Sequence, residues 1–404
     1  MTYMSQRREN PKEKNFSGYN VTFGILSALA ILMIVAGHAG YDILTVGGLF
    51  PYYSFHVPLF LFISGYFYRQ EEEAHPLAYL KKKGKRLLVP YFAWNAVYGV
   101  ISWALRVFGG FSMGEGLSLK TLFLSPFLNG YQFIYNYAAW FVPVLFLIEV
   151  MNLCMRLIIR RPLRRWFGID GEWLFLLGSL AVGMLVVQLA IEGRVWGLYK
   201  TPGRILFLYP CFQMGQFYKK KLEERDRLGN LQYFVIVIGV QVLLHLCCNG
   251  LAYSSVWCTG FANGPLIPYV TAVSGTAFWL RVAKILSPLC AGGQSDRSAA
   301  GSFLLYLGRN TYAVMMHHVM AFMLVKMVLA GIAARTGYLS DFDFVRFYGD
   351  IDYYYAVKGS EAFYMVYLAA GVGLPLLLQR GLDVWLPAVR RLLSVSVRSR
   401  SSEG

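Results

Sequence analysis

Residues 21–40 read VTFGILSALAILMIVAGHAG and contain no Lys, Arg, Asp or Glu. An α-helix rises about 1.5 Å per residue, so this block is long enough to cross the hydrocarbon core of a bilayer, which is about 30 Å thick. The polar segment before it has no cleavable-signal pattern, so we expect the block to stay in place as a membrane helix. Similar apolar blocks recur along the chain, more than a soluble core needs.

The composition agrees with a membrane protein. The chain has 404 residues and is 56% hydrophobic but only 15% charged, with a mean hydropathy of +0.46, whereas soluble domains carry about a quarter charged residues. The formal net charge of +16 lies in short runs of Lys and Arg between apolar blocks rather than on one exposed basic face. We therefore expect contact with membrane lipids and no binding of nucleic acid.

We predict an all-α, polytopic membrane helix bundle with about ten transmembrane helices. A polar segment (1–20) precedes the membrane domain (21–380), and a basic tail (381–404) follows it. The predicted spans are Val21–Gly40, Tyr52–Tyr68, Leu88–Phe108, Ala138–Leu157, Trp173–Ile191, Gly203–Phe217, Leu231–Asn249, Gly264–Val282, Asn310–Gly331 and Ala362–Leu378.

The basic residues predict the orientation. If the N-terminus is inside and the spans alternate, most of the 38 Lys and Arg residues fall in cytoplasmic segments, as the positive-inside bias requires. Both termini are then cytoplasmic, and the chain is a multi-pass protein of the plasma or inner membrane. Two longer external loops, 109–137 and 333–361, combine aromatic residues with carboxylates. Such surfaces suit sugar rings, although an ordinary aromatic belt at the interface accounts for them too.

Histidines stand at the predicted outer ends of the first two spans. His38 lies late in the first span, and His56 opens the second, so two antiparallel helices bring two imidazoles to a similar depth. Imidazole exchanges a proton near neutral pH, which makes His38 the candidate catalytic base. His56 is a candidate substrate contact, with packing at the interface as an equal alternative.

Further polar residues lie inside the apolar spans, where they are costly without a function or a partner. Glu149, in the fourth span, is a second catalytic candidate that could orient a histidine, although a structural hydrogen bond accounts for it equally well. Trp140, His317 and His318 are candidate substrate-binding residues. Adjacent histidines point about 100° apart on a helix, so the pair is a poor metal site.

Cations at the predicted cytoplasmic mouths could hold the phosphates of a nucleotide-bearing donor, although positive-inside anchoring explains them as well. The chain has no GxSxG, Walker, HExxH or CxxC motif, and we expect no metal. A disulfide from Cys247 or Cys248 to Cys258 is an open alternative to free, membrane-buried cysteines. The candidate donor-binding residues are Arg69, Lys85, Arg86, Arg309 and Asn310.

Five segments, in this order, resemble the integral-membrane proteins of acyltransferase family 3, particularly the branch that modifies surface polysaccharides. The resemblance implies a ten-span bundle, an acyl-CoA donor (acetyl-CoA by default) and transfer to a carbohydrate hydroxyl. The segments are ALAILMIVAGH (28–38), FHVPLFLFISGYFYR (55–69), KKKGKRLLVPYF (81–92), AAWFVPVLFLIE (138–149) and LGRNTYAVMMHH (307–318).

His38 matches the family's first-span histidine, which is regarded as catalytic, and Lys85 and Arg86 match the basic stretch before the third span. Ser27 stands where many members have an arginine associated with donor binding, and Arg69 or Arg309 is a candidate to replace it. The resulting hypothesis is a membrane-embedded O-acyltransferase, whose whole reaction takes place in the bundle. The alternative is a transporter or flippase of a glycan or lipid-linked sugar, for which the expected internal repeats are not visible.

Overall fold

The computed structural model describes residues 19–40, 44–128, 130, 132–168, 171–254, 258–291, 298–357 and 360–400. Residues 1–18 and the tail side chains beyond residue 385, which carry part of the predicted cytoplasmic charge, lie outside this description, as does Tyr131 of the first predicted external loop.

Helices make up almost all of the described regular structure. They are α1 (Val21–His38), α2 (His56–Tyr66), α3 (Pro76–Lys83), α4 (Val89–Gly109), α5 (Ser125–Leu128), α6 (Phe141–Met155), α7 (Arg161–Phe167), α8 (Glu172–Ile191), α9 (Lys200–Phe217), α10 (Asn230–Cys247), α11 (Ile267–Ala291), α12 (Ala299–Arg309), α13 (Thr311–Arg335), α14 (Phe344–Gly349) and α15 (Tyr364–Arg400).

The predicted fold class, a polytopic helical membrane protein, is confirmed. Seven helical segments in the described residues are long and apolar enough to cross a membrane. Each of the ten predicted spans coincides with a helix, but α2 is shorter than predicted because a separate 3₁₀ turn (Tyr52–Ser54) precedes it. The helices α9 and α11 contain the cations Lys200, Arg204, Arg281 and Lys284, which lower their apolar character.

Two predicted spans are far too short. Helical structure runs over Pro76–Gly109 and, with a kink at Asn136, over Ile134–Phe167. Charged side chains end an apolar block without ending the helix, so the boundaries drawn from hydropathy stop early. Each of the two segments contains a π-helical turn at its basic part, Gly84–Leu88 in one and Arg156–Arg160 in the other.

Arg156, at the end of the predicted fourth span, and Arg160, in the predicted cytoplasmic segment after it, are buried. Arg156 donates two hydrogen bonds of 3.0 Å to the carboxylate of Glu172, at the start of α8. Lys220 donates to the same carboxylate at 2.7 Å, and Arg160 pairs with Glu73 at 3.0 Å. Because a buried charge is stable only with partners, this network joins α6, α8 and the turn after α9.

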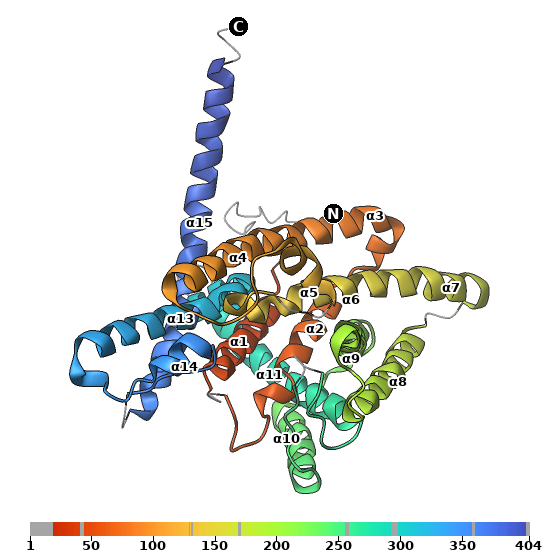
Figure 1. Cartoon of the computed structure of the whole chain (residues 1–404). Coiled ribbons are helices and arrows are strands. Elements are labelled where there is room, and N and C mark those ends of the chain that lie inside the picture. The colour runs from red at the N-terminus through yellow and green to blue at the C-terminus, as the bar shows by residue number, and fades with distance from the viewer. Residues whose placement is uncertain are drawn as a thin grey trace, which may run out of the picture.

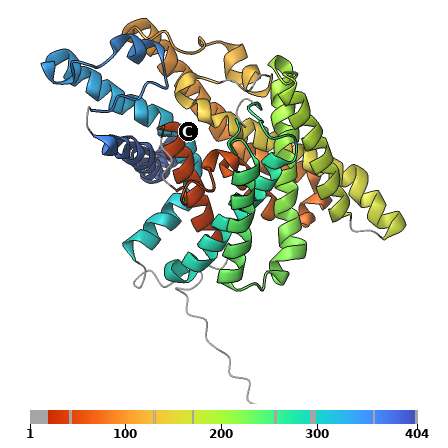
Figure 2. The ribbon, with the colours of Figure 1, turned by 90° about the horizontal axis from the view of Figure 1, so that it is seen from below.

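Helix α1 occupies the middle of the bundle, between the blue helices of the C-terminal part and the green helices α8–α10 (Figures 1 and 2). It begins where the side chain of Asn20 accepts a hydrogen bond of 3.1 Å from the backbone of Phe23, an N-cap that replaces a missing helical partner. It packs against α2, α11, α12, α13 and α15. By contrast, α15 extends well beyond the bundle (Figure 1).

Glycines allow two pairs of helices to meet backbone to backbone. A methyl group added at Gly215 of α9 would overlap the carbonyl oxygen of Phe62 in α2, and one added at Gly65 would overlap that of Phe212. Gly308 of α12 lies equally close to the backbone of α1. Small residues at such crossings replace the hydrophobic driving force that helices lack in lipid.

The periphery exposes apolar side chains, as expected of a surface that faces lipid. In α10 only Val237, Gln241 and Leu244 are buried. The spacing of four and three residues places these three on one face, and Gln241 satisfies its amide with Phe50 and Ser274. The rest of the helix presents leucine, isoleucine and valine outward.

The prediction that the two external loops present aromatic surfaces is mostly wrong, because most of these aromatic side chains are buried. Phe111, Phe133, Tyr135, Tyr353 and Tyr355 are buried, where they join the core around α13 and α15. These loops fold back on the bundle, since an apolar ring gains more from burial than from exposure to water.

The six cysteines are free, so the alternative of a disulfide to Cys258 is wrong.

Candidate active site

One cavity, with a volume of about 1590 Å³, runs along α1. Its lining begins at Tyr19 and Asn20, just before α1, and reaches His38 and Gly40 at the other end of that helix. An 18-residue helix is about 27 Å long at about 1.5 Å per residue. The cavity therefore extends along the full length of a membrane-crossing helix. We call its two ends the Tyr19 end and the His38 end.

At the His38 end, two histidines form a pair. His38 Nδ1 and His318 Nε2 lie 2.8 Å apart, and His318 Nδ1 lies 2.8 Å from the carbonyl oxygen of Val314. A carbonyl oxygen only accepts, so His318 carries its proton on Nδ1 and offers a lone pair at Nε2. His38 Nδ1–H then donates to that lone pair. The lone pair of His38 is left on Nε2, and His38 lines the cavity.

Tyrosines and an aspartate complete the His38 end. The ring of Tyr137 lies edge-on to His38, with 5.3 Å between ring centres, and its hydroxyl donates to Asp352 at 3.5 Å. Asp352 and Tyr354 also line the cavity. Desolvation, and after it the charge of Asp350, raise the pKa of the Asp352 carboxyl. The sequence indicated a loop of mixed carboxylates and tyrosines, but it could not select these three residues.

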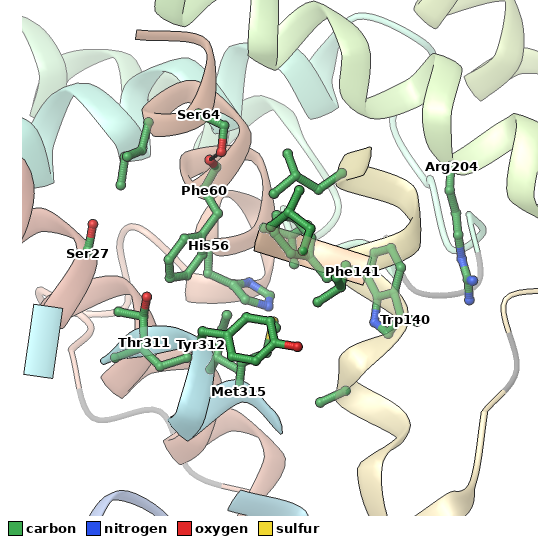
Figure 3. Close-up of a pocket in the computed structure, with 18 of the residues that line it drawn as sticks. Ser27, His56, Phe60, Ser64, Trp140, Phe141, Arg204, Thr311, Tyr312 and Met315 are labelled. Atoms are coloured by element: carbon green, nitrogen blue, oxygen red, sulfur yellow. Dashed lines mark hydrogen bonds between the residues drawn. The ribbon is translucent and has the colours of Figure 1, made fainter. Parts of the chain in front are cut away.

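His56 and Trp140, two candidate substrate-binding residues, face the same cavity (Figure 3). His56 Nδ1 donates to the carbonyl oxygen of Tyr52 at 2.7 Å. That bond fixes the tautomer and leaves the lone pair on Nε2. Tyr312 and Phe60 lie beside His56 in Figure 3, so this part of the cavity combines aromatic walls with a few polar atoms.

His317 and His318 do not line the cavity. His317 Nδ1 lies 2.8 Å from the hydroxyl of Tyr98, and the Trp94 ring is 4.2 Å away. His318 lies behind His38. Neighbouring residues of a helix point in different directions, which separates the two rings, and the predicted substrate contact is replaced by a pairing of His318 with the catalytic candidate.

Glu149 lines the cavity, but it does not orient a histidine. Its carboxylate accepts hydrogen bonds from the hydroxyl of Tyr79 and from the ammonium of Lys83. The structural alternative therefore describes Glu149 better than a catalytic role, because a carboxylate in a membrane helix needs such partners. Among the described residues, no three His, Cys, Asp or Glu side chains are grouped as a metal site would require.

The Tyr19 end of the cavity is cationic. Arg69, Arg86 and Arg309 line it, together with Lys82 and Lys83. Lys82 pairs with Glu72 at 2.6 Å, and the guanidinium carbon of Arg309 lies 4.3 Å from the centre of the Tyr19 ring.

Two predicted donor contacts are outside this cluster. Lys85 does not line the cavity, although the neighbouring Arg86 does. The side-chain amide of Asn310 turns back to the carbonyl oxygen of Tyr306 at 2.8 Å, where it closes the end of α12.

A family model described as an acyltransferase domain matches residues 24–378. The chain belongs to acyltransferase family 3. It is therefore a membrane acyltransferase, and the resemblance drawn from the five segments is confirmed at the level of the family. Comparison with curated proteins and with solved structures gave no significant match.

In this acyltransferase, Ser27 lines the cavity between its two ends, and its hydroxyl donates to the carbonyl oxygen of Phe23 at 2.7 Å. A serine bonded to its own helix carries no charge into the cavity. Arg69 and Arg309, the two candidates to replace the family arginine, line the same cavity.

Proposed function

We propose that this acyltransferase moves an acyl group, by default acetyl, from cytoplasmic acyl-CoA to a hydroxyl of a cell-surface carbohydrate. One observation supports this most: a single cavity joins a cationic end to a histidine end along a membrane-crossing helix. Two substrates can therefore meet without either one crossing the membrane. Membership of an acyltransferase family favours this function over transport.

The Tyr19 end suits coenzyme A. Its nucleotide phosphates need several cations, and Arg69, Arg86 and Arg309 supply guanidinium groups that bind phosphate in a fork. The long thioester arm would then extend along α1, past Ser27 and Phe60. In the orientation predicted from the basic residues, this end faces the cytoplasm.

The His38 end suits a sugar hydroxyl. Tyr137, Tyr354 and Trp140 offer aromatic faces, and Asp352 offers a carboxylate that accepts hydrogen bonds from hydroxyls. In the predicted orientation this end faces outward, toward the polysaccharides at the surface of a plasma or inner membrane.

The geometry supports general-base catalysis. The Nε2 atom of His38 takes the proton as the acceptor oxygen attacks the thioester carbon, and the hydrogen bond from Nδ1–H to His318 stabilises the positive ring. The carbon–sulfur bond then breaks, and the leaving thiolate receives the same proton. The products are the ester and free coenzyme A. Placing both reactants in one enclosed cavity lowers the barrier further.

The purified acyltransferase in lipid nanodiscs, given acetyl-CoA labelled in its acetyl group and a panel of glycosides, tests this proposal. We expect label on a sugar hydroxyl together with an equal amount of free coenzyme A. No consumption of acetyl-CoA or of any longer acyl-CoA, with and without glycosides, would contradict the proposal.

Replacing one of the cations at the Tyr19 end should weaken the binding of the acyl donor. We expect Arg86→Gln to raise KM for acetyl-CoA by about three- to tenfold with little change in kcat, because exposed cation–phosphate contacts are modest and screened by salt. Lys85→Gln is the matched control, since this substitution removes the same charge at a neighbouring residue that does not line the cavity. Equal KM values for the two variants would exclude Arg86 from donor binding.

His318 should act through His38. We expect His318→Ala to lower kcat by about tenfold to a hundredfold while KM for acetyl-CoA stays constant, the range typical of losing a partner that orients an imidazole. His317→Ala is the control, because His317 bonds to Tyr98 instead. Steady-state kinetics of both variants would measure kcat and KM separately. An equal loss of kcat in the two variants would refute a catalytic role for the pair of His38 and His318.

A further inference from the structure

A buried lysine stands on the same helix face as the partner of the proposed base. Lys326 of α13 has an exposed fraction of 1%, and its helix is long and apolar enough to cross a membrane. Lys326 follows His318 by eight residues and Phe322 by four, a spacing that places the three side chains on one face of the helix. A charge in such a helix is costly unless it has partners, so the contacts of Lys326 indicate its role.

Two contacts connect Lys326 to the segment 350–354. The ammonium group donates a hydrogen bond of 2.6 Å to the carbonyl oxygen of Ile351. The same ammonium lies 5.1 Å from the centre of the Tyr354 ring, which is within the range of a cation–π contact. The two contacts fall on either side of Asp352 in the sequence. Lys326 therefore holds the backbone that carries Asp352 against α13.

Phe322 connects the lysine to the histidine pair. Its ring lies edge-on to that of His318, with 5.7 Å between ring centres, and edge-on to that of Tyr354, with 5.6 Å. Tyr354 therefore packs on both Phe322 and Lys326. The face of α13 that supports His38 through His318 thus continues directly into the part that holds Tyr354.

The segment 350–354 forms part of the His38 end of the cavity. Asp352 lines the cavity, whereas Lys326 does not. The carboxylate of Asp352 accepts a hydrogen bond of 3.5 Å from the hydroxyl of Tyr137, whose ring lies edge-on to that of His38. Lys326 can therefore act on a bound substrate only through the segment that it holds.

The charge of Lys326 also favours the ionised form of Asp352. Burial raises the pKa of the Asp352 carboxyl, and the charge of Asp350 raises this pKa further, whereas the charge of Lys326 lowers it. An ionised carboxylate offers both oxygens as acceptors to the hydroxyls of a sugar. A neutral residue in place of Lys326 would thus disturb both the position and the ionisation of Asp352.

We propose that Lys326 is a positioning residue of the acceptor site: it holds the segment 350–354 against α13, so that the cavity-lining side chains of this segment bind hydroxyls of the carbohydrate beside His38. This inference rests on the proposed transfer to a carbohydrate. One helix then aligns both sides of the reaction, the base through His318 and the acceptor through Lys326.

Lys326→Met tests the proposal, because it keeps a long side chain and removes both the charge and the hydrogen-bond donor. The assay uses the purified protein in nanodiscs, labelled acetyl-CoA and the glycoside that the wild type acetylates fastest. We expect KM for the glycoside to rise about tenfold or more. KM for acetyl-CoA should stay close to that of the wild type, because the cationic cluster lies at the other end of the cavity. Lys326→Arg keeps the charge and the donor and should restore part of the affinity for the glycoside.

The control is Lys120→Met, the same change at an exposed lysine, which should leave both KM values unchanged. Asp352→Asn should also raise KM for the glycoside. Because Lys326 acts partly through Asp352, the double variant should show less than the product of the two single effects. Equal KM values for the glycoside in the wild type and in Lys326→Met would overturn the proposal. An equal rise of KM for both substrates would overturn it too, because it would mark a general loss of structure.

Hydrogen exchange separates this inference from the proposed function, since it needs no acceptor. Backbone amides of the segment 350–354 should exchange faster in Lys326→Met than in the wild type, whereas those of α1 should keep their protection. Unchanged exchange in the segment would overturn the role of Lys326 even if the wild type acetylates a glycoside. If the wild type acetylates none, faster exchange confined to the segment would still support the positioning role, and only the proposed function would be contradicted.

Discussion

His38→Ala is expected to lower kcat for acyl transfer by about two to four powers of ten, the usual contribution of a general base. The reason is the arrangement of protons: the hydrogen bond that His38 Nδ1–H donates to His318 leaves the His38 lone pair on Nε2, and His38 is the member of the pair that lines the cavity. Alanine removes the base and the hydrogen bond together. The measurement is the initial rate with labelled acetyl-CoA at saturating concentrations of both substrates.

The matched control is His245→Ala, a change of the same size at an exposed histidine of α10. It should keep the wild-type rate. Affinity of His38→Ala for acetyl-CoA should also remain close to that of the wild type, because the cationic cluster lies at the other end of the cavity. Undiminished transfer by His38→Ala would end its assignment as the base.

Gly215→Val is expected to prevent correct folding. Any side chain at this position would overlap the carbonyl oxygen of Phe62 and crowd the backbone nitrogen of Tyr66, and rigid backbone cannot move aside as a flexible side chain can. Overpacking typically costs about 1–3 kcal/mol, and here α2 and α9 would have to separate along their whole contact. Size-exclusion chromatography in mild detergent, with thermal unfolding of whatever protein is recovered, measures the effect.

Gly239→Val in α10 provides the comparison. Gly239 is also helical, but an added Cβ there meets nothing within 4 Å. It should therefore give protein of wild-type size and stability. A stable, monodisperse Gly215→Val protein would show that the contact between α2 and α9 is looser than the structure has it.

Hydropathy alone predicted the helical membrane architecture, because a bilayer leaves the backbone no alternative to helices once the apolar blocks are long enough. Hydropathy did not predict where the helices begin and end. The basic residues around Gly84 and Arg156 end the apolar pattern, yet the backbone continues to form helical hydrogen bonds through them. Tertiary contacts, such as the pairing of Arg156 with Glu172, make that continuation stable, and no local pattern records them.

The site could be predicted only in part for a similar reason. His38 and His56 stand out as polar residues at the ends of apolar spans, and both line the cavity. The partner of His38, however, is 280 residues away in the sequence, and nothing local distinguishes His318 from His317.

The histidine pair ends at the carbonyl oxygen of Val314, and an amide oxygen is far too weak a base to carry a proton onward. A proton taken up by His38 therefore does not pass on through His318, and in the proposed mechanism it returns to the sulfur that leaves. Each catalytic cycle would be electrically silent across the bilayer. Acylation of this kind should run equally well in energised and de-energised membranes, and its rate should follow the supply of the acyl donor and of the acceptor.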